Sequence, residues 1–473
     1  MELLESIVAF IGDNVSLILT VMIFVVGIFM TIKFRAGQVR HLGKGIKYLF
    51  TEEDGAKGDV SSFGAFCTAL SATIGTGNIV GVATAICAGG PGALFWMLIA
   101  AIFGMATKYA ECLLAVKYRR QNQDGSFTGG PFLYIEDGMG KKWRWLAVFF
   151  AVCGALCCLM GIGSFSQINS MSSALDRIIP SSVAFMIGTT PITWTVIIGG
   201  FLLSVIIAIV LLGGLKRISS VSTVLVPFMA ILYVLLCVIV LFANLDKIPF
   251  AFSQIIEGAF NPQAVTGGAV GSIIIAMQKG VARGIFSNEA GLGSAPIAAA
   301  AARTNSAVRQ GLISMTGVFF DTIIICMLTG LTVVISGAWN TGAEGFGVTA
   351  SAFSSAIPFL PQGLVEGILS VCLIIFAFTT ILGWNYYGDR CVDYITNGNK
   401  KWKKIFRIVH IALIFVGPYL TVSLVWNVAD VINSFMAFPN IIALLCLSGV
   451  VVKETKAYFK NKKENKNVEE KQV

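Results

Sequence analysis

Charged residues are scarce in this chain. Asp, Glu, Lys and Arg together make up 12 % of 473 residues, whereas hydrophobic residues make up 56 %. Soluble domains contain roughly 25 % charged residues. Too few charges are present to cover a water-facing surface of this size, which excludes a soluble globular protein and a disordered one. The composition predicts an integral membrane protein with many spans.

Histidine and paired cysteine motifs are also lacking. The two histidines, His41 and His410, are too few for a His-based metal centre. Eleven cysteines lie mostly within apolar stretches with no CxxC pair, which indicates packing residues. No HExxH motif, nucleophile–base set or paired catalytic carboxylates occurs, so an enzyme is not expected. The net charge of +9 lies mostly in short loops, which argues against nucleic acid as a partner.

Long apolar runs dominate the chain. A helix needs about 20 apolar residues to cross the hydrocarbon core of a bilayer. The sequence predicts an all-α integral membrane protein with eleven transmembrane helices. The expected spans are 14–33, 60–88, 91–118, 144–175, 189–212, 219–244, 269–301, 308–337, 362–396, 403–424 and 426–453.

Basic residues between the spans alternate from one side to the other. Six Lys and Arg residues follow each of the first, third and ninth spans, and seven lie from Lys453 to the end. Intervening loops on the opposite side carry one or none. Because basic loops stay in the cytoplasm, the pattern predicts an N-terminus outside the cell membrane and a C-terminus inside. The tail, 454–473, is expected to be solvated or disordered.

Three basic residues fall within spans and need partners. Lys108 precedes Glu111 by one helical turn, which predicts a structural pair near the inner end of span 3. Lys279 and Arg283 precede Glu289, and Asp321 in span 8 is the expected counter-ion of Arg283. Either an ion-pair network that fixes helix packing or a direct part in function would explain them.

The polar, Gly-rich interruptions of spans 2 and 7 indicate an internal repeat. The breaks are expected near 71–78 and 283–294, and each is followed by a span, an amphipathic stretch (129–140 or 342–355) and three more spans. Five spans per unit means that the second unit is inverted. We therefore predict an N-terminal helix and loop (1–58), a first repeat (59–245) and a second repeat (246–453).

Paired broken helices in inverted repeats are typical of secondary transporters whose site lies at the bilayer midplane. Unwound backbone at this depth must line a cavity or be buried in protein. Free N–H groups at a half-helix N-terminus favour a carboxylate, and free carbonyls favour a cation or an ammonium. The two breaks suit a zwitterion together with a monovalent cation. A channel would need a continuous polar path instead.

Several long motifs resemble the alanine/glycine:cation symporter family, also called sodium:alanine symporters. The resemblance covers about residues 10–455. It rests on GTGNIVGVATAICAGGPGALFWM, GMATKYAECLLAVKYR, GGPFLYIEDGMG, GVARGIFSNEAGLGSAPIAAAAA, RQGLISMTGVFFDTIIICMLTG and FTTILGWNYYGDRC. The resemblance implies a leucine-transporter-like fold, with one extra helix before a 5+5 inverted repeat. It also implies Na⁺-coupled uptake of small neutral amino acids, alanine or glycine, into the cell.

The resemblance also implies roles for individual residues. The substrate carboxylate would meet the backbone of the first broken helix, and the second broken helix would meet the ammonium. Gln167 and Asn169 would face the pocket from span 4, and Trp384 would cap it from span 9, unless it is a packing residue. The implied substrate residues are Thr73, Gly75, Thr76, Gly77, Asn78, Gln167, Asn169, Phe286, Ser287, Asn288, Gly291, Thr380 and Trp384.

Two adjacent hydroxyls in span 9 carry the implied cation site. Residues of this type can instead bond to their own helix. In leucine-transporter-like proteins the corresponding hydroxyls bind Na⁺ together with carbonyls of the first broken helix. The implied Na⁺ ligands are Ala72, Thr73, Gly75, Phe376, Thr379 and Thr380. No other cofactor is expected. Glu289 is the candidate if the coupling ion is H⁺, and glutamine or another neutral amino acid is the alternative substrate.

Overall fold

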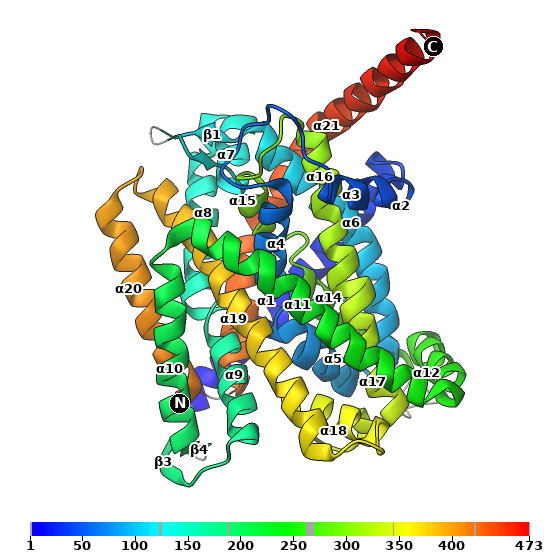
Figure 1. Cartoon of the computed structure of the whole chain (residues 1–473), viewed down its shortest axis with the longest axis vertical. Coiled ribbons are helices and arrows are strands. Elements are labelled where there is room, and N and C mark those ends of the chain that lie inside the picture. The colour runs from blue at the N-terminus through cyan, green and yellow to red at the C-terminus, as the bar shows by residue number, and fades with distance from the viewer. Residues whose placement is uncertain are drawn as a thin grey trace.

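The computed structural model describes residues 2–122, 125–187, 190–261, 269–343, 345–420 and 422–472. Most of it is helical, and Figure 1 shows the long helices running side by side between two ends. The chain starts with α1 (Glu2–Lys33), α2 (Gly37–Arg40) and α3 (Leu42–Leu49).

The next helix is interrupted where a break was expected. Ser61 caps its start, since the hydroxyl accepts a hydrogen bond from the Gly64 amide at 3.0 Å. The two halves are bent by 51°. The elements are α4 (Ser62–Thr73), a π-helical turn η1 (Gly77–Gly81), α5 (Val82–Gly89) and then the long α6 (Gly92–Lys117).

A small hairpin and short turns lead to the fourth predicted span. They are β1 (Arg120–Gln121), β2 (Phe127–Thr128), α7 (Pro131–Leu133), η2 (Tyr134–Gly138) and η3 (Lys141–Trp143). β1 and β2 pair antiparallel, with Arg120 opposite Thr128.

The fourth predicted span contains a break that the sequence analysis did not predict. This span consists of α8 (Arg144–Met160) and α9 (Phe165–Ile178), and the break between them lies at Gly161–Ser164. A second hairpin, β3 (Val183–Ile187) and β4 (Thr190–Thr193), pairs antiparallel ahead of α10 (Trp194–Leu211). The expected start of the fifth span at 189 is therefore wrong, because residues 190–193 form a strand.

The middle of the chain continues with α11 (Gly214–Ala243), η4 (Leu245–Lys247), α12 (Ile248–Phe260), α14 (Ala269–Asn288) and α15 (Ala295–Ala299). Next come α16 (Ala307–Val318), a π-helical segment η5 (Phe319–Cys326), α17 (Met327–Ser336), η6 (Ala338–Asn340) and α18 (Phe346–Ala356). The last elements are α19 (Gln362–Ile395), α20 (Lys400–Val416), η7 (Gly417–Tyr419) and α21 (Val422–Gln472).

The tail forms part of the last helix. α21 continues to Gln472, so residues 454–472 extend it. In Figure 1 this end of α21 projects beyond the body of the molecule.

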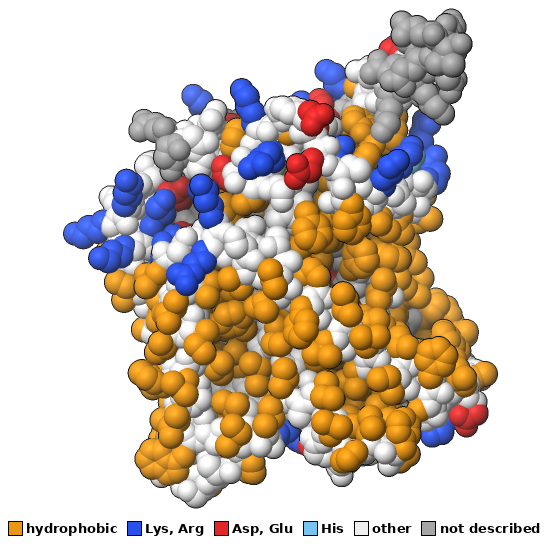
Figure 2. Space-filling model, viewed as in Figure 1, with side chains coloured by type: hydrophobic (Ala, Val, Ile, Leu, Met, Phe, Trp, Pro, Cys, Tyr) orange, Lys and Arg blue, Asp and Glu red, His pale blue; other side chains and the backbone are white. Residues whose placement is uncertain are grey.

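Within the described residues, seven helices are long and apolar enough to span a membrane, or eight if the bent α4–α5 pair is one span. The other three predicted spans lie on α1, α14–α15 and α20, so the count of eleven stays a prediction. The spanning window of α11 is only 33 % buried inside the protein. Figure 2 shows a wide hydrophobic surface around the middle and basic residues gathered at the end from which α21 projects. This surface is matched to the interior of a bilayer.

α6 and α19 lie at the centre and position the site. Most of α6 is buried, and it packs on both α14 and α16. α19 packs on α4, α8, α9 and α11 and is buried through its middle, from Phe376 to Gly388.

Candidate substrate and cation site at the broken helix

Side-chain oxygens satisfy the backbone of the first break. The amide of Gly75 donates to Asn78 Oδ1 at 2.9 Å, and the amide of Thr76 donates to Gln167 Oε1 at 3.3 Å. Gln167 reaches the break from the first turn of α9 because that helix begins at Phe165, after the Gly161–Ser164 interruption. The break in the fourth span thus places the polar side chain of Gln167 next to the break in the second span.

The hydroxyl of Thr76 is buried in the break without a hydrogen-bond partner among the described residues. A buried polar group left unpaired costs roughly 1–3 kcal/mol. Such a group, beside backbone amides held only by side-chain oxygens, marks this position as a place for a polar ligand.

α19 approaches the break through Thr380. Its hydroxyl lies 3.2 Å from the Ile74 carbonyl oxygen and 3.0 Å from the Phe376 carbonyl oxygen. A Cβ on Gly75 would lie 2.5 Å from Thr380 Oγ1, so α19 can come this close only to glycine. Three oxygens from two helices converge here.

The other predicted cation ligands surround this point without all facing it. Thr379 Oγ1 donates to the Phe376 carbonyl at 3.0 Å and also contacts Met229 Sδ at 3.5 Å. Thr73 Oγ1 bonds to Ala69 of its own helix at 2.7 Å. Ala72 packs against Gly383 of α19, where a Cβ would lie 2.7 Å from the Ala72 backbone nitrogen. The sequence analysis missed the Ile74 carbonyl, for which the sequence carries no signal.

A buried carboxylate joins the two breaks. Asp321, in the π-helical η5, accepts hydrogen bonds from Asn78 Nδ2 at 2.7 Å and from Ser287 Oγ at 2.9 Å. It also accepts one from Thr322 Oγ1 at 2.7 Å, and Thr322 Oγ1 in turn accepts one from Asn288 Nδ2 at 3.1 Å. Asp321 therefore connects η1 to the end of α14. π-helical turns often occur at functional sites.

The prediction that Asp321 is the counter-ion of Arg283 is wrong. Arg283 pairs instead with Asp430 of α21, with both nitrogen–oxygen distances at 3.4 Å. Its guanidinium also lies over the rings of Trp426, at 4.7 Å, and Phe286, at 5.5 Å. Hydropathy does not reveal the rotation of α14, so the sequence could not tell which neighbouring helix this side chain meets.

Phe286 connects this ion pair to the break. Its ring lies 5.0 Å from that of Trp426, and its edge would be 3.3 Å from a Cβ placed on Gly77. Phe286 thus lies between the first break and the Arg283–Asp430 pair.

The second break holds a separate polar network. α14 ends at Asn288, and the next residues adopt positive φ at Glu289, Gly291 and Gly293. Glu289 accepts hydrogen bonds from Trp384 Nε1 at 2.8 Å and Ser294 Oγ at 2.6 Å. Trp384 is therefore held by a carboxylate in the interior and does not face the first break as a cap.

Lys108 and Glu111 also bond to residues of this second break. The structural pair predicted between them is not formed, since no salt bridge joins the two within the described residues. Lys108 Nζ donates to the Asn288 carbonyl at 2.7 Å, where a positive charge is favoured at a helix C-terminus. Glu111 accepts from the Gly291 amide at 3.0 Å. Gly291 lies with Glu111 and Ile23, away from Asn78.

One further prediction is not met by the geometry. Asn169 donates to the Leu420 carbonyl at 2.9 Å, at the start of the last helices, and is not part of the first break. Within the described residues no group of three or more His, Cys, Asp or Glu side chains is arranged to hold a metal ion. A cation at the first break would be bound by hydroxyl and carbonyl oxygens.

Comparison with known proteins gives the family. Residues 1–472 match the model of the sodium:alanine symporter family. The chain belongs to the sodium:alanine symporter family. Members of this family are sodium-coupled transporters, not enzymes, and the chain is a multi-pass membrane protein.

Three relatives set the family in context. An uncharacterized transporter of Haemophilus influenzae is 51 % identical over 93 % of this chain and 92 % of its own length. The sodium/alanine symporter AgcS of Methanococcus maripaludis is 44 % identical over 96 % of this chain and all of its own. A probable sodium/glutamine symporter, GlnT of Bacillus subtilis, is 37 % identical over 98 % of this chain and 93 % of its own.

A solved structure confirms the fold class of the family member. The crystal structure of MhsT in complex with L-phenylalanine aligns with a TM-score of 0.57 at 15 % identity. It covers 84 % of this chain and 98 % of the other. The fold is thus of the leucine-transporter type, as the resemblance implied.

Proposed function

We propose that this chain couples Na⁺ entry to the uptake of a small neutral amino acid, alanine or glycine, by alternating access. The observation that carries the proposal is the bridge at the first break, where Thr380 of α19 lies within 3.2 Å of the Ile74 carbonyl oxygen. The identity of 44 % to a sodium/alanine symporter supports alanine as the substrate. The identity of 37 % to a probable sodium/glutamine symporter supports glutamine as the second candidate.

The proposed transporter has eleven spans, with the N-terminus outside and the C-terminus in the cytoplasm. The alternation of basic loops supports this orientation. The gathering of basic side chains at one end of the molecule in Figure 2 agrees with it. Repeats over 59–245 and 246–453 would relate the two breaks by inversion.

In this proposal the substrate carboxylate binds the amides of the first break. Asn78 Oδ1 and Gln167 Oε1 now accept from the amides of Gly75 and Thr76, and a carboxylate would replace these oxygens. Thr76 Oγ1, now unpartnered, would donate to the carboxylate. Ser287, Asn288 and the Phe286 ring would enclose the ammonium end. Trp384, Asn169 and Gly291 hold the surrounding helices in this scheme and do not touch the substrate.

Na⁺ would bind beside the substrate, between the break and α19. The ligands are the hydroxyls of Thr380 and Thr379 with carbonyl oxygens from Ala72, Thr73, Gly75 and Phe376. Na⁺ requires several oxygens in place of its lost water, and the three oxygens that already converge at Thr380 support this position. The ion would hold α19 against the break and so favour the arrangement that binds the amino acid.

Uptake of labelled alanine into proteoliposomes tests the function. We expect accumulation under an inward Na⁺ gradient, with unlabelled glycine as a competitor; D-alanine and glutamine are tested alongside. Uptake driven only by an H⁺ gradient would refute the proposed Na⁺ site, and Glu289 would then be the candidate proton carrier. If glutamine displaces the bound tracer and alanine is not transported, the substrate is glutamine and the proposed mechanism still holds.

The valine substitution Thr380→Val should weaken Na⁺ binding more than Thr379→Val does. Both keep the side-chain shape and remove one hydroxyl, but only Thr380 contacts the break. Removing one ligand costs roughly 1–3 kcal/mol of Na⁺ binding free energy, which raises the Na⁺ concentration for half-maximal uptake by about 5- to 150-fold. The Na⁺ dependence of alanine uptake measures it. An effect of Thr379→Val as large as that of Thr380→Val would contradict the larger role given to the Thr380 contact with the break.

The Arg283–Asp430 pair is proposed as the outer latch of the site. Asp430 lies eight residues into α21, roughly 12 Å from the helix start that faces away from the basic end. The side chains are 18 % and 25 % exposed, so the pair is partly open to water. The latch covers Phe286 and, through it, the break.

Arg283→Gln should speed alanine release to the outside by about 5-fold, since a partly exposed pair contributes roughly 1 kcal/mol at most. Tracer release from preloaded, Na⁺-saturated protein measures this. Arg177→Gln is the matched control. Arg177 pairs with Glu366 at a nitrogen–oxygen distance of 3.7 Å, and this pair lies away from the break. Equal acceleration in both variants would show a general charge effect and refute the latch.

A further inference from the structure

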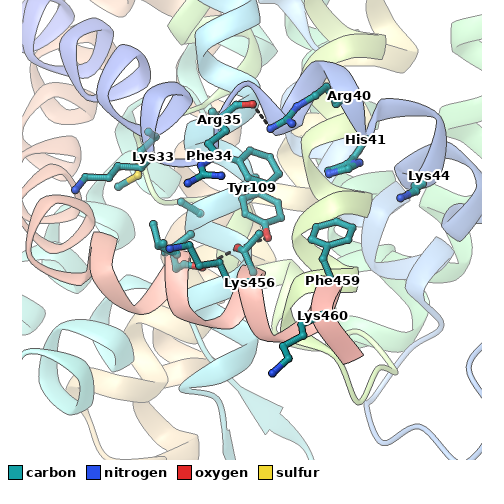
Figure 3. A pocket seen from close by; sticks show the side chains of 16 residues that line it. Lys33, Phe34, Arg35, Arg40, His41, Lys44, Tyr109, Lys456, Phe459 and Lys460 are labelled. Atoms are coloured by element: carbon teal, nitrogen blue, oxygen red, sulfur yellow. Dashed lines mark hydrogen bonds between the residues drawn. The ribbon is translucent and has the colours of Figure 1, made fainter. Parts of the chain in front are cut away.

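A cavity lies among α1, α2, α3, α6 and α21, and no described residue of the two broken helices lines it. Its volume is about 570 Å³. Figure 3 shows it from close by, with side chains of the α1–α3 region facing those of α21. Six of its sixteen lining residues are Lys or Arg, and none is Asp or Glu. They are Lys33, Arg35, Arg40, Lys44, Lys456 and Lys460.

Few of these charges are neutralised by the protein. Lys460 pairs with Glu464 at 3.8 Å, whereas Arg40 donates to the Arg35 carbonyl, which carries no net charge. In the described part of the chain no carboxylate lies within 4 Å of the charged groups of the other four residues. Burial and the neighbouring charges of Lys44 and Arg40 lower the pKa of His41, so the positive charge comes from the Lys and Arg side chains.

The floor of the cavity is aromatic and apolar. Phe34 and Tyr109 stack with ring centroids 4.0 Å apart, and His41 stacks on Phe459 at 4.4 Å. Tyr109 and Thr455 share a hydrogen bond of 2.6 Å, which fixes α21 against α6. These contacts hold the walls of the cavity together without using the lysine side chains.

Both walls change from apolar to basic at the same level. On α1 the exposed Ile32 is followed by Lys33, and on α21 Val451 and Val452 line the cavity ahead of Lys456. Such a change from apolar to basic residues is typical of the headgroup region of a bilayer. Orientation of the protein needs only basic loops, not a cavity between three helices, so topology alone does not account for it.

We propose that this cavity binds the phosphate-bearing headgroup of an anionic lipid from the cytoplasmic leaflet. Basic pockets between transmembrane helices on this side are suited to such headgroups. The apolar residues between the cations favour a lipid over a soluble phosphate, because Met30, Ala106 and Val451 could receive the start of an acyl chain. A bound headgroup would bridge α1 and α21 across the cavity. The leaflet assignment rests on the orientation proposed above.

The test compares two triple variants of the full-length protein. Lys33→Gln/Lys44→Gln/Lys456→Gln removes three charges from the cavity. Lys141→Gln/Lys142→Gln/Lys400→Gln removes three exposed charges from the same basic side, outside it. Phosphatidylglycerol is titrated into each protein in phosphatidylcholine nanodiscs, and bound lipid is counted by native mass spectrometry.

We expect the cavity variant to bind phosphatidylglycerol about 100-fold more weakly than wild type, or roughly 5-fold per charge removed, and the control to bind like wild type. Equal loss in both variants would overturn the proposal. Glycerol phosphate is added as a competitor, and displacement of the lipid at matching concentration would assign the cavity to a soluble anion instead. If the triple variant does not fold, Lys44→Gln and Lys456→Gln alone should each give the single 5-fold step. The measurement reads lipid binding and not transport, so it stands apart from the proposed uptake.

Discussion

Gly75→Ala is expected to reduce Na⁺-driven alanine uptake by at least about 100-fold. The added Cβ would lie 2.5 Å from Thr380 Oγ1 and 3.1 Å from Gln167 Oε1. Thr380 would have to turn away, which removes its hydroxyl from the Ile74 carbonyl and from the proposed Na⁺ site. Initial uptake rates at saturating Na⁺ measure the effect.

Gly81→Ala is the matched control for this substitution. Gly81 ends the π-helical turn that follows Gly75, has a φ of −62°, and has no atom of another segment within 4 Å of its Cβ position among the described residues. We expect uptake within about 2-fold of wild type. In a Thr380→Ala background, Gly75→Ala should cause little further loss, because the atom it meets is gone. Independent losses in the double variant would show that the steric account is wrong.

Asp321→Ala should abolish the mutual effect of Na⁺ and alanine on each other's affinity. In two coupled sites this effect is typically 5- to 150-fold and equal in both directions. Without the carboxylate, Asn78 of the first break and Ser287 of the second lose their common acceptor. We expect the ratio of alanine dissociation constants without and with Na⁺ to fall below about 3.

Loss of stability must be separated from loss of coupling. Thr329→Ala is the control, because Thr329 is equally buried on the next helical segment and shares a 2.8 Å hydrogen bond with Tyr233. Thr329→Ala should lower the free energy of unfolding by roughly 1–3 kcal/mol and leave the coupling between Na⁺ and alanine binding unchanged. Asp321→Asn keeps the shape and removes the charge, so retained coupling there would assign the effect to hydrogen bonding. Wild-type coupling in Asp321→Ala would contradict the proposed link.

Much of the helical framework is predictable because apolar runs of spanning length have few alternatives. The first break is predictable for a related reason, since GTGN places polar and glycine residues at membrane depth. The break at Gly161–Ser164 is less visible because glycines flanked by apolar residues also suit close packing of helices. The strand of β3, Val183–Ile187, is apolar enough to be taken for the approach to a span.

The sequence does not predict the direction in which each side chain points. Asn169 and Gln167 are two residues apart on α9, yet only Gln167 reaches the first break. Trp384 is one turn from Thr380 and meets Glu289 of the other break. These outcomes depend on the rotation of each helix and on the neighbour it meets, which hydropathy does not encode. Asp321 was noticeable as a charge in mid-span, but its partner was not.

α19 contacts all three interruptions of the helical framework. Thr380 meets the first break, Trp384 meets the second through Glu289, and a Cβ on Gly163 would lie 2.7 Å from Trp384 Cβ at the third. A rotation of this one helix would therefore disturb all three at once. Packed interfaces of this kind switch between discrete arrangements and do not deform gradually. In the Na⁺-driven symporter proposed above, this arrangement would restrict slippage, because α19 could not leave one break without disturbing its contacts at the other two.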